Sequence, residues 1–306
     1  MLTRREIFKG AGGLAAAAFG GALYSTVIEP GFRLTHKHWH VGHVAWPVSL
    51  RPLRIAVLTD IHAIKPWMSI GRIEHIVASA NALKADLVVL LGDFVPGDRI
   101  KQFATGDVSI AEWSAALGAL RAPLGVFAVL GNHDWWTDAR GVRRGLEKAG
   151  IRVLDNQTAR LTLDGHRIWL AGLGDQLAIP IRGGFRGVDD LDATLAPTLG
   201  NRDPLILLAH EPDIFIRVPS RVTLTLSGHT HGGQVYLPFI GRPFIPSEFG
   251  QRFAYGHIVE GGRNLIVSSG LGMTAVPVRF MVPPEIAVVT LGPSLGAPAV
   301  DRVSIL

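Results

Sequence analysis

The sequence predicts an α/β protein in which two β-sheets pack together and are covered by helices. Short apolar segments alternate with helix-length amphipathic segments from Leu53 onward, which is typical of parallel strands joined by helices. Later, two apolar runs flank Asp164 and Gly165, the dipeptide of a tight hairpin turn. Hydrophobic residues make up 48% of the 306 positions, which is ample for a large core. We therefore expect parallel strands first and more antiparallel strands later.

The first half reads as strands and helices in alternation. Strands are expected at 54–59, 87–91 and 126–130, and helices at 71–83, 110–120 and 139–149. The run 87–91 is continuously apolar, which indicates a strand buried on both faces. The helix at 71–83 carries apolar residues at helical spacing, and Gly150 follows the last helix as a stop signal.

The second half contains more strands and longer loops. Two strands, 159–163 and 167–171, are expected around the hairpin turn. Further strands are expected at 205–209, 223–226, 265–268 and 286–291. Clusters of Pro and Gly at 180–187 and 238–250 predict long surface loops.

The N-terminus resembles a twin-arginine export signal. Arg4 and Arg5 precede an uncharged stretch, 10–28, that is rich in Ala and Gly. Its length is close to the ~20 residues that span a bilayer, so a cleaved signal and a retained membrane anchor are both open. Export predicts a periplasmic location or the outer face of the cytoplasmic membrane, with the twin-arginine export machinery as a partner. If the segment is retained as an anchor, the chain would also associate with the membrane.

Charge and cysteine content exclude several classes of function. The formal net charge is +5, but no run of five or more Lys and Arg occurs, so no nucleic-acid partner is expected. Because cysteine is absent, disulfides, Cys-ligated zinc and a Cys nucleophile are excluded. Any metal must then be held by His, Asp, Glu or Asn, and 12 His residues are available.

Polar clusters follow five of the expected strands, where α/β sheets place their ligand sites. They are Asp60-Ile61-His62, Gly92-Asp93, Gly131-Asn132-His133-Asp134, Ala209-His210 and Gly228-His229-Thr230-His231. Carboxylate, imidazole and amide oxygen are ligands that bind Mn, Fe or Zn, and two metals ~3.5 to 4 Å apart can share one carboxylate.

These motifs, in this order, resemble the calcineurin-like metallophosphoesterase superfamily over residues 53 to about 291. The stretch Ser227 to Gln234, together with Ser269 to Gly272 and Pro283 to Glu285, is similar to the phosphodiesterase subgroup of YaeI and YkuE type. The resemblance implies the four-layer αββα metallophosphoesterase fold. It also implies an enzyme, a metal-dependent phosphoric ester hydrolase that acts as a phosphodiesterase.

The same resemblance implies a division of roles among the clustered residues. One divalent metal would be bound by Asp60, His62 and His231, and the other by Asn132, His210 and His229, with Asp93 bridging the two ions. The two ions would be Mn, Fe or Zn, all of which accept these ligands. A metal-bound hydroxide would attack phosphorus in line. His133 would act as the general acid that protonates the leaving alkoxide, a task suited to an imidazole with an ordinary pKa of about 6.5.

The partner that orients His133 departs from the family pattern. Related phosphatases often carry an acidic residue three positions beyond the bridging Asp, and here that place is Pro96. Asp98 or Asp134 could substitute. Asp134 is therefore counted as a second catalytic candidate.

Other polar and aromatic residues have plainer interpretations. His36, His38 and His40 alternate as on one face of a strand, which predicts an edge strand rather than a third metal site, since no carboxylate joins them. Glu211 is either a loop residue or a support for its neighbour His210. Arg242 is expected in solvent.

Trp135 and Trp136 follow the catalytic turn, and we expect them to line the substrate site or to pack in the core.

The domain boundaries follow from these features. Residues 1–28 form the signal or anchor, 29–52 a lead-in strand segment, 53–292 the metallophosphoesterase catalytic domain and 293–306 a C-terminal tail. The expected substrate is a small-molecule or lipid-linked phosphate diester. A pyrophosphatase or phosphomonoesterase of a nucleotide-linked lipid would use the same centre, and a noncatalytic metal-dependent binding protein is a third hypothesis.

Overall fold

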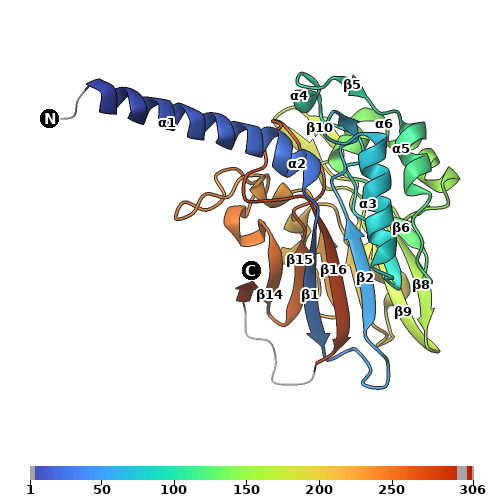
Figure 1. The fold of residues 1–306 in the computed structure, drawn as a ribbon. Coiled ribbons are helices and arrows are strands. Elements are labelled where there is room, and N and C mark those ends of the chain that lie inside the picture. The colour runs from blue at the N-terminus through green and yellow to red at the C-terminus, as the bar shows by residue number, and fades with distance from the viewer. Residues whose placement is uncertain (1–3, 295–301, 305–306) are drawn as a thin grey trace.

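Two β-sheets lie at the centre of the computed structural model, which describes residues 4–294 and 302–304 (Figure 1). The six-stranded sheet has the order β1-β16-β2-β4-β6-β7, with bounds Thr35–His43, Glu285–Pro293, Leu53–Leu58, Leu87–Leu90, Val126–Ala128 and Arg152–Val153. The seven-stranded sheet has the order β17-β14-β15-β13-β12-β9-β8. Its strands are Arg302–Ser304, Gly256–Glu260, Arg263–Val267, Leu224–Ser227, Leu205–Leu208, His166–Gly172 and Gln157–Leu163.

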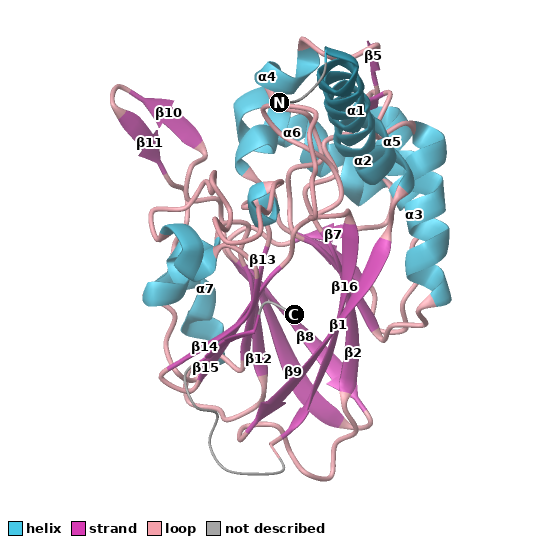
Figure 2. Cartoon of the chain, turned by 60° about the vertical axis from the view of Figure 1, so that its left-hand side comes forward, coloured by secondary structure: helices cyan, strands magenta, loops and turns pink. Residues whose placement is uncertain are grey.

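Alternation along the strands produces four layers. In β2, Ile55 and Val57 enter the core between the sheets, whereas Ala56 and Leu58 enter the core beneath the helices. Helices α3 (Ile70–Ala82), α5 (Ile110–Leu117) and α6 (Asn132–Lys148) cover that outer face. Helix α7 (Leu191–Leu195) and the 3₁₀ turn Pro212–Ile216 cover the other sheet (Figure 2). The predicted αββα architecture is confirmed.

The strand directions agree with the pattern of short connections. β2, β4, β6 and β7 run parallel, and β9, β12, β13 and β15 do the same in the other sheet. β8 and β9 form the expected antiparallel hairpin around Asp164 and Gly165. Because parallel strands end at the same edge, the loops after these strands gather at one end of each sheet.

The edge strand β1 carries the alternating histidines. It pairs parallel to β16 from Thr35 to His43 and lies at the end of its sheet, as predicted. The Nε2 atom of His36 lies 2.8 Å from the Ser79 hydroxyl. The lead-in segment is thus part of the central sheet.

Helix α6 begins earlier than the sequence indicates. We expected it at 139–149, but it starts at Asn132 and continues through a non-helical residue, Asp138, to Lys148. Gly131 is the N-cap, and the Asp134 carboxylate accepts a hydrogen bond from the Gly131 N–H, which stabilises this start. The first turn was missed because its polar and aromatic residues show no apolar periodicity.

Two expectations for the second half also need correction. The segment predicted as a loop at 180–187 instead belongs to a small hairpin, formed by Ile179–Ile181 (β10) and Gly184–Arg186 (β11), that projects from the body (Figure 2). β14 was not expected, although its apolar residues pair antiparallel with β15.

In the first half, two further two-residue strands, β3 (Ile64–Lys65) and β5 (Gly106–Asp107), pair with each other beside the short helix α4 (Asp98–Lys101).

The N-terminal segment forms a helix that extends away from the sheets (Figure 1). It consists of α1 (Arg4–Leu23), a π-helical turn η1 (Tyr24–Ile28) and α2 (Glu29–Phe32). Among the helices that the structure describes, none combines the length and apolar character needed to cross a membrane. The buried Glu29 carboxylate accepts hydrogen bonds from the N–H groups of Met281 and Val282, which attaches α2 to the body.

The predicted end segments are described only in part. Met1 to Thr3 lie outside the described residues, as do 295–301 and 305–306 of the expected tail. Arg302–Ser304 pairs with β14 as strand β17, and β16 continues to Pro293.

Candidate metal centre

The seven candidate ligands follow the carboxyl ends of strands from both sheets. Asp60 and His62 follow β2, Asp93 follows β4 and Asn132 follows β6, all in the six-stranded sheet. His210 follows β12, whereas His229 and His231 follow β13 in the other sheet. The two sheet edges therefore meet at this centre.

Five of these residues have left-handed backbone conformations. The φ angles are 54° at Asp60, 44° at His62, 56° at Asp93, 66° at His229 and 51° at His231. Residues other than glycine seldom adopt this region, and each costs on the order of 1 kcal/mol or more. The sharp turn at each position directs a ligand side chain into the centre instead of continuing the strand.

The first cluster consists of Asp60, His62, Asp93 and His231. All four are buried, and their ligand atoms lie within 4.8 Å of one another. His62 Nε2 lies 3.1 Å from His231 Nε2 and 3.5 Å from Asp93 Oδ2, and His231 Nε2 lies 3.5 Å from Asp60 Oδ1. These distances place four potential ligands around one point.

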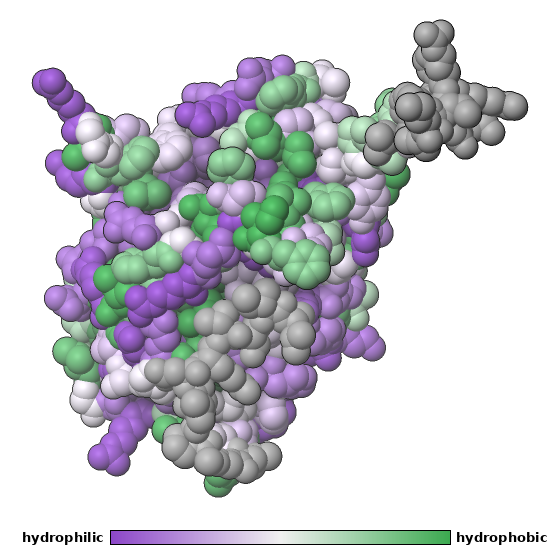
Figure 3. Space-filling view, turned by 90° about the vertical axis from the view of Figure 1, so that its left-hand side faces the viewer, coloured by the Kyte–Doolittle hydropathy of each residue, from purple (hydrophilic) through white to green (hydrophobic). Residues whose placement is uncertain are grey.

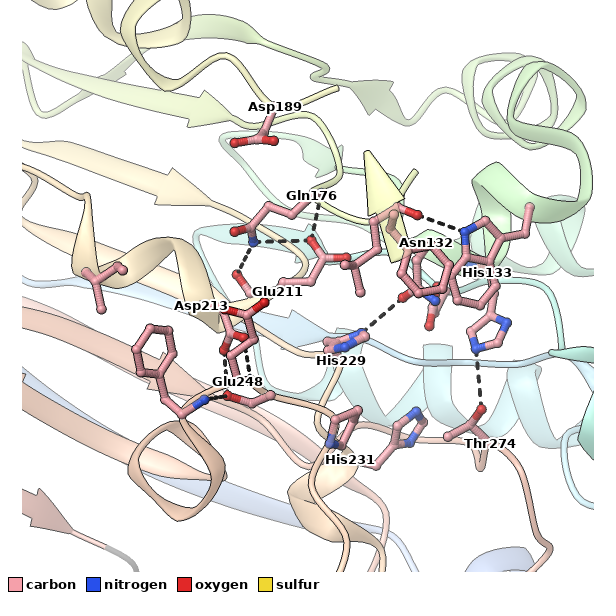
Figure 4. A pocket seen from close by; sticks show the side chains of 18 of the residues that line it. Asn132, His133, Gln176, Asp189, Glu211, Asp213, His229, His231, Glu248 and Thr274 are labelled. Carbon is pink, nitrogen blue, oxygen red and sulfur yellow. Dashed lines mark hydrogen bonds between the residues drawn. The ribbon is translucent and has the colours of Figure 1, made fainter. Parts of the chain in front are cut away.

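The second cluster shares Asp93 with the first. Asp93 Oδ2 lies 3.3 Å from His210 Nε2, and His229 completes the group. Asn132 Oδ1 lies 3.2 Å from His210 Nε2 and 3.0 Å from His229 Nδ1, so the amide oxygen points into the same space (Figure 4). A single carboxylate thus joins two donor sets, the arrangement needed to hold two neighbouring ions.

The donor atoms fit divalent cations. Burial lowers the pKa of His62 to about 3 and that of His229 to about 4, so both rings are neutral at pH 7, the form that binds metals. The Nδ1 of His62 contacts the carbonyl of Val95 at 2.9 Å, and that of His210 contacts the carbonyl of Leu91 at 2.6 Å. Donation to the Val95 carbonyl leaves the Nε2 lone pair of His62 directed at the centre, whereas Asp93 and other acidic neighbours raise the pKa of His210 despite its burial, so a metal would displace the proton from its Nε2.

Asp134 holds the loops that carry the ligands. Its Oδ2 accepts from the N–H groups of Asp93 at 2.9 Å and Gly131 at 3.0 Å. Its Oδ1 accepts from Phe94 at 2.9 Å and Val95 at 3.2 Å. The expectation that Asp134 orients the imidazole of His133 is therefore wrong: its two oxygens bind the backbone of the loop after β4 and the start of α6.

His133 has a different ring partner from the one expected. Its backbone N–H donates to Asp93 Oδ1 at 2.9 Å, and its Nε2 lies 3.4 Å from the Thr274 hydroxyl. Asp98, the other expected partner, is exposed and pairs with Lys101 at 2.9 Å. Thr274 was missed because it lies two residues beyond the Ser269 to Gly272 motif, in a loop without a recognisable pattern.

Neighbouring groups confine the His133 ring from several sides. The Trp136 ring meets it edge-on with centroids 4.9 Å apart, and the His62 ring does so at 5.1 Å. A Cβ at Gly97 would lie 2.4 Å from His133 Cε1, so only glycine fits beneath the ring. Trp136 lines the pocket in front of the centre, whereas Trp135 packs against the core beneath the helices.

A pocket of about 750 Å³ opens in front of the metal centre (Figure 4). One part of its wall is aromatic, where Phe185 of β11 stacks on Trp136 with ring centroids 5.0 Å apart. Another part is acidic and includes Asp189, Asp213 and Glu248. The pocket therefore offers both flat apolar surface and negative charge beside the ligands.

Glu211 belongs to a buried pair of acids next to His210. Burial and the neighbouring Glu211 raise the pKa of Asp175 well above its usual range, whereas His210 and other neighbours lower the pKa of Glu211 despite its burial. The two opposite shifts favour a proton on Asp175 over one on Glu211. Gln176 N–H donates to Glu211 at 3.1 Å, and Glu211 also lines the pocket. Glu211 therefore lies in the pocket wall next to the ligand His210, where it holds the segment at Gln176.

Arg242 is buried, contrary to the expectation of a solvated loop residue. Its guanidinium donates to the carbonyl of Gly232 and lies over the rings of Tyr236 at 5.3 Å and Tyr255 at 5.0 Å. These contacts hold the turn directly after His231.

The family model and the similar proteins found by comparison agree on one family. The model of the calcineurin-like phosphoesterases matches residues 53–233. The chain is 33% identical to the uncharacterized metallophosphoesterase YkuE of Bacillus subtilis over 95% of this chain and 98% of YkuE. It is 28% identical to the phosphodiesterase YaeI of Escherichia coli over 95% of this chain and all of YaeI, and 30% identical to an uncharacterized metallophosphoesterase of Aquifex aeolicus over 78% and 85%.

Proposed function

The chain belongs to the calcineurin-like phosphoesterase family, and on that premise we propose that it is a two-metal phosphodiesterase. One observation carries the proposal: the Asp93 carboxylate is common to two buried sets of metal-ligand atoms. Membership of the family implies a metal-dependent phosphoric ester hydrolase. The finer statement, that the substrate is a diester, is supported by the similarity to a relative named a phosphodiesterase and by the charge of the pocket.

The residues of the centre would divide the chemistry between binding and proton transfer. Asp60, His62 and His231 would hold one ion and Asn132, His210 and His229 the other, with Asp93 between them. Two divalent ions supply Lewis acidity, which activates water and neutralises charge on the phosphoryl group. His133, which follows Asn132 in the chain, lines the pocket, where its ring can hold a proton for the leaving oxygen.

The charge of the pocket favours a diester over a monoester. Among the described residues that line it, Arg217 supplies the one guanidinium, and this group already forms an ion pair with Asp189 at 3.2 Å. Asp213 and Glu248 add negative charge. A phosphate diester carries one negative charge, whereas monoesters and pyrophosphates carry two or more near neutral pH. Repulsion from these carboxylates therefore disfavours the more highly charged substrates.

The experiment compares three substrate classes on one preparation. Protein loaded with Mn²⁺ should release nitrophenol from bis(p-nitrophenyl) phosphate faster than from p-nitrophenyl phosphate, and should release little phosphate from pyrophosphate. A preference for the monoester or for pyrophosphate would replace the proposal with the corresponding alternative. Absence of hydrolysis with Mn²⁺, Fe²⁺ and Zn²⁺ alike would reject an enzymatic function.

We also propose that the protein is exported and works at the outer side of a cytoplasmic membrane. Support comes from the paired arginines at the start of a segment rich in Ala and Gly. Replacing both Arg4 and Arg5 by Lys should retain the protein in the cytoplasmic fraction, while the unchanged chain is recovered outside it. Equal distribution of the two forms would argue against twin-arginine export.

A further inference from the structure

A second cavity, of about 560 Å³, adjoins the metal centre and is mainly apolar. Three loop segments form its walls: 233–235, 243–246 and 274–276. The side chains that enclose it are Val235, Pro243, Phe244, Ile245, Pro246, Ala275 and Val276. His231 and Thr274 line both this groove and the pocket in front of the metals, so the two spaces are contiguous. We call this second cavity the apolar groove.

The walls of the apolar groove are held in place by hydrogen bonds. The Gln234 amide accepts from the Thr274 N–H at 2.6 Å and donates to the carbonyls of Val276 and Val278 at 3.2 and 3.3 Å. These bonds join the segment after His231 to the loop 274–278. On the opposite side, a Cβ at Gly233 would lie 2.9 Å from the Phe244 carbonyl, so the two segments are in close contact. The groove is therefore part of the folded structure.

The chemistry of the lining selects an uncharged occupant. Among the described residues that line the groove, none is Asp, Glu, Lys or Arg. The polar Gln234 already has its amide bonded to the walls. A hydrocarbon chain is the occupant that such a surface binds best, because each methylene removed from water contributes favourably without requiring a polar partner.

Exposed apolar residues continue from the groove to the outer surface. Phe244 is 78% exposed and Val276 47% exposed at its rim, and Phe239 and Ile240 are exposed on the same loop as Phe244. Met281 is also exposed, next to the contacts that attach α2. Figure 3, which views the face from which α1 projects, shows hydrophobic residues gathered in its upper part. Phe244 and Val276 thus expose apolar side chains at the rim of an apolar groove, where such exposure is typical of a binding site.

We propose that the apolar groove receives the hydrocarbon chain of an amphiphilic phosphate diester, whose phosphate lies at the metal centre. This inference rests on the proposed phosphodiesterase function. Two sites of opposite character meet at His231 and Thr274: a centre for cations that binds the anionic phosphate, and an uncharged groove beside it. A lipid phosphodiester has the same juxtaposition of an anionic group and a chain.

The test uses a series of p-nitrophenyl alkyl phosphates, from methyl to octyl, at concentrations where all are monomeric. Bis(p-nitrophenyl) phosphate, which has no chain, serves as the reference. We expect kcat/KM to rise by about fourfold for each methylene that enters the groove, as follows from the transfer free energy of a methylene group, about 0.8 kcal/mol. A flat series together with normal turnover of the reference overturns the groove proposal alone. Absence of turnover on every diester overturns the proposed function first.

Substitutions at the rim test whether the groove causes the rise. Phe244→Asp and Val276→Asp introduce charge at exposed positions, so the ratio of kcat/KM for the octyl ester to that for the methyl ester should fall toward one. Phe239→Asp is the matched control, since Phe239 is exposed on the same loop but does not line the groove, and it should keep the ratio of the unchanged protein.

An equal fall of the ratio in all three variants would contradict the proposal, as would an unchanged ratio in both rim variants. Because two rim positions, Phe244 and Val276, are substituted separately, the second variant remains as the test if the first fails to fold. Sedimentation at the assay concentration addresses a competing occupant: a stable dimer that either rim variant dissociates, in a protein with a flat chain-length series, would assign this surface to a second copy of the chain.

Discussion

The hydroxyl of Thr274 lies 3.4 Å from Nε2 of His133 and joins the loop after β15 to the first turn of α6. These residues are 141 positions apart in the chain. The contact replaces the carboxylate that we expected to orient this imidazole. It also places Thr274 at the junction of the metal pocket and the apolar groove.

Replacing His133 by Ala should slow turnover without loss of metal. General acid catalysis contributes about 10²- to 10⁴-fold when the leaving group is a poor one. We therefore expect kcat for an alkyl leaving group to fall within that range and kcat for a p-nitrophenolate leaving group to fall much less, because nitrophenolate departs without a proton. Steady-state kinetics on both substrates, with metal content measured on the same samples, checks this. Equal losses on the two substrates would exclude a role in proton donation.

Thr274→Val should act on catalysis through His133. The substitution keeps the shape of the side chain and removes the hydroxyl near Nε2. We expect kcat for the alkyl leaving group to fall by about tenfold, in keeping with the loss of one hydrogen bond, and its pH profile to shift. Thr274→Ser, which restores the hydroxyl, should recover the rate and the profile. If Ser and Val behave alike, Thr274 only packs.

Asp134→Asn should destabilise the protein and weaken metal binding. The carboxylate accepts four backbone hydrogen bonds in a buried site, and the amide of Asn would turn one acceptor into a donor facing those N–H groups. We expect a loss of about 2 to 3 kcal/mol in the free energy of unfolding of the metal-free protein. Urea denaturation measures it. Asp192→Asn, at an exposed position in α7, is the control and should change stability by less than ~0.5 kcal/mol.

Metal stoichiometry should depend on which ligand is removed. Asp93 belongs to both donor sets, whereas His62 belongs to one. Asp93→Ala should therefore reduce metal content below one ion per chain, and His62→Ala should leave about one, since the second set is intact. Elemental analysis after gel filtration measures both, with His36→Ala on the edge strand expected to retain two. Equal metal content in the Asp93 and His62 variants would contradict a shared carboxylate.

Asp175→Asn should remove a pH dependence of stability. In the unfolded chain an Asp ionises near pH 3.9, whereas burial and Glu211 raise the pKa of Asp175 in the folded protein. Its contribution to stability is thus fully present below about pH 4 and is lost as the pH rises toward the folded-state pKa. Asn mimics the protonated acid, accepting from the Leu177 N–H as Asp175 does at 2.8 Å and donating to Glu211.

The free energy of unfolding of the variant, relative to that of the unchanged protein, should therefore increase from pH 5 to pH 8. Urea denaturation of both proteins without metal, at those two pH values, gives the comparison. A difference that is constant with pH would show that Asp175 is ionised in the folded state.

Local sequence patterns predicted most of the elements and their order. The apolar runs of β2, β4 and β12 are short and buried on both faces, and the Asp164-Gly165 turn specifies its hairpin, so neither depends on distant residues. The start of α6 and the strand β14 were not predicted. Their residues lack clear periodicity, and their structure depends on a cap by Asp134 and on pairing with β15.

The sequence by itself determined which residue types follow which strands, and hence which side chains are candidate metal ligands, because a motif at a strand end is a local property. Only the tertiary structure decided how those side chains meet. The approach of two sheet edges makes Asp93 common to both donor sets, directs Asp134 to backbone amides and brings Thr274 to His133. Such contacts depend on the packing of segments far apart in the chain, and no local pattern encodes them. For the same reason the apolar groove, enclosed by three separate loops, is a property of the fold alone.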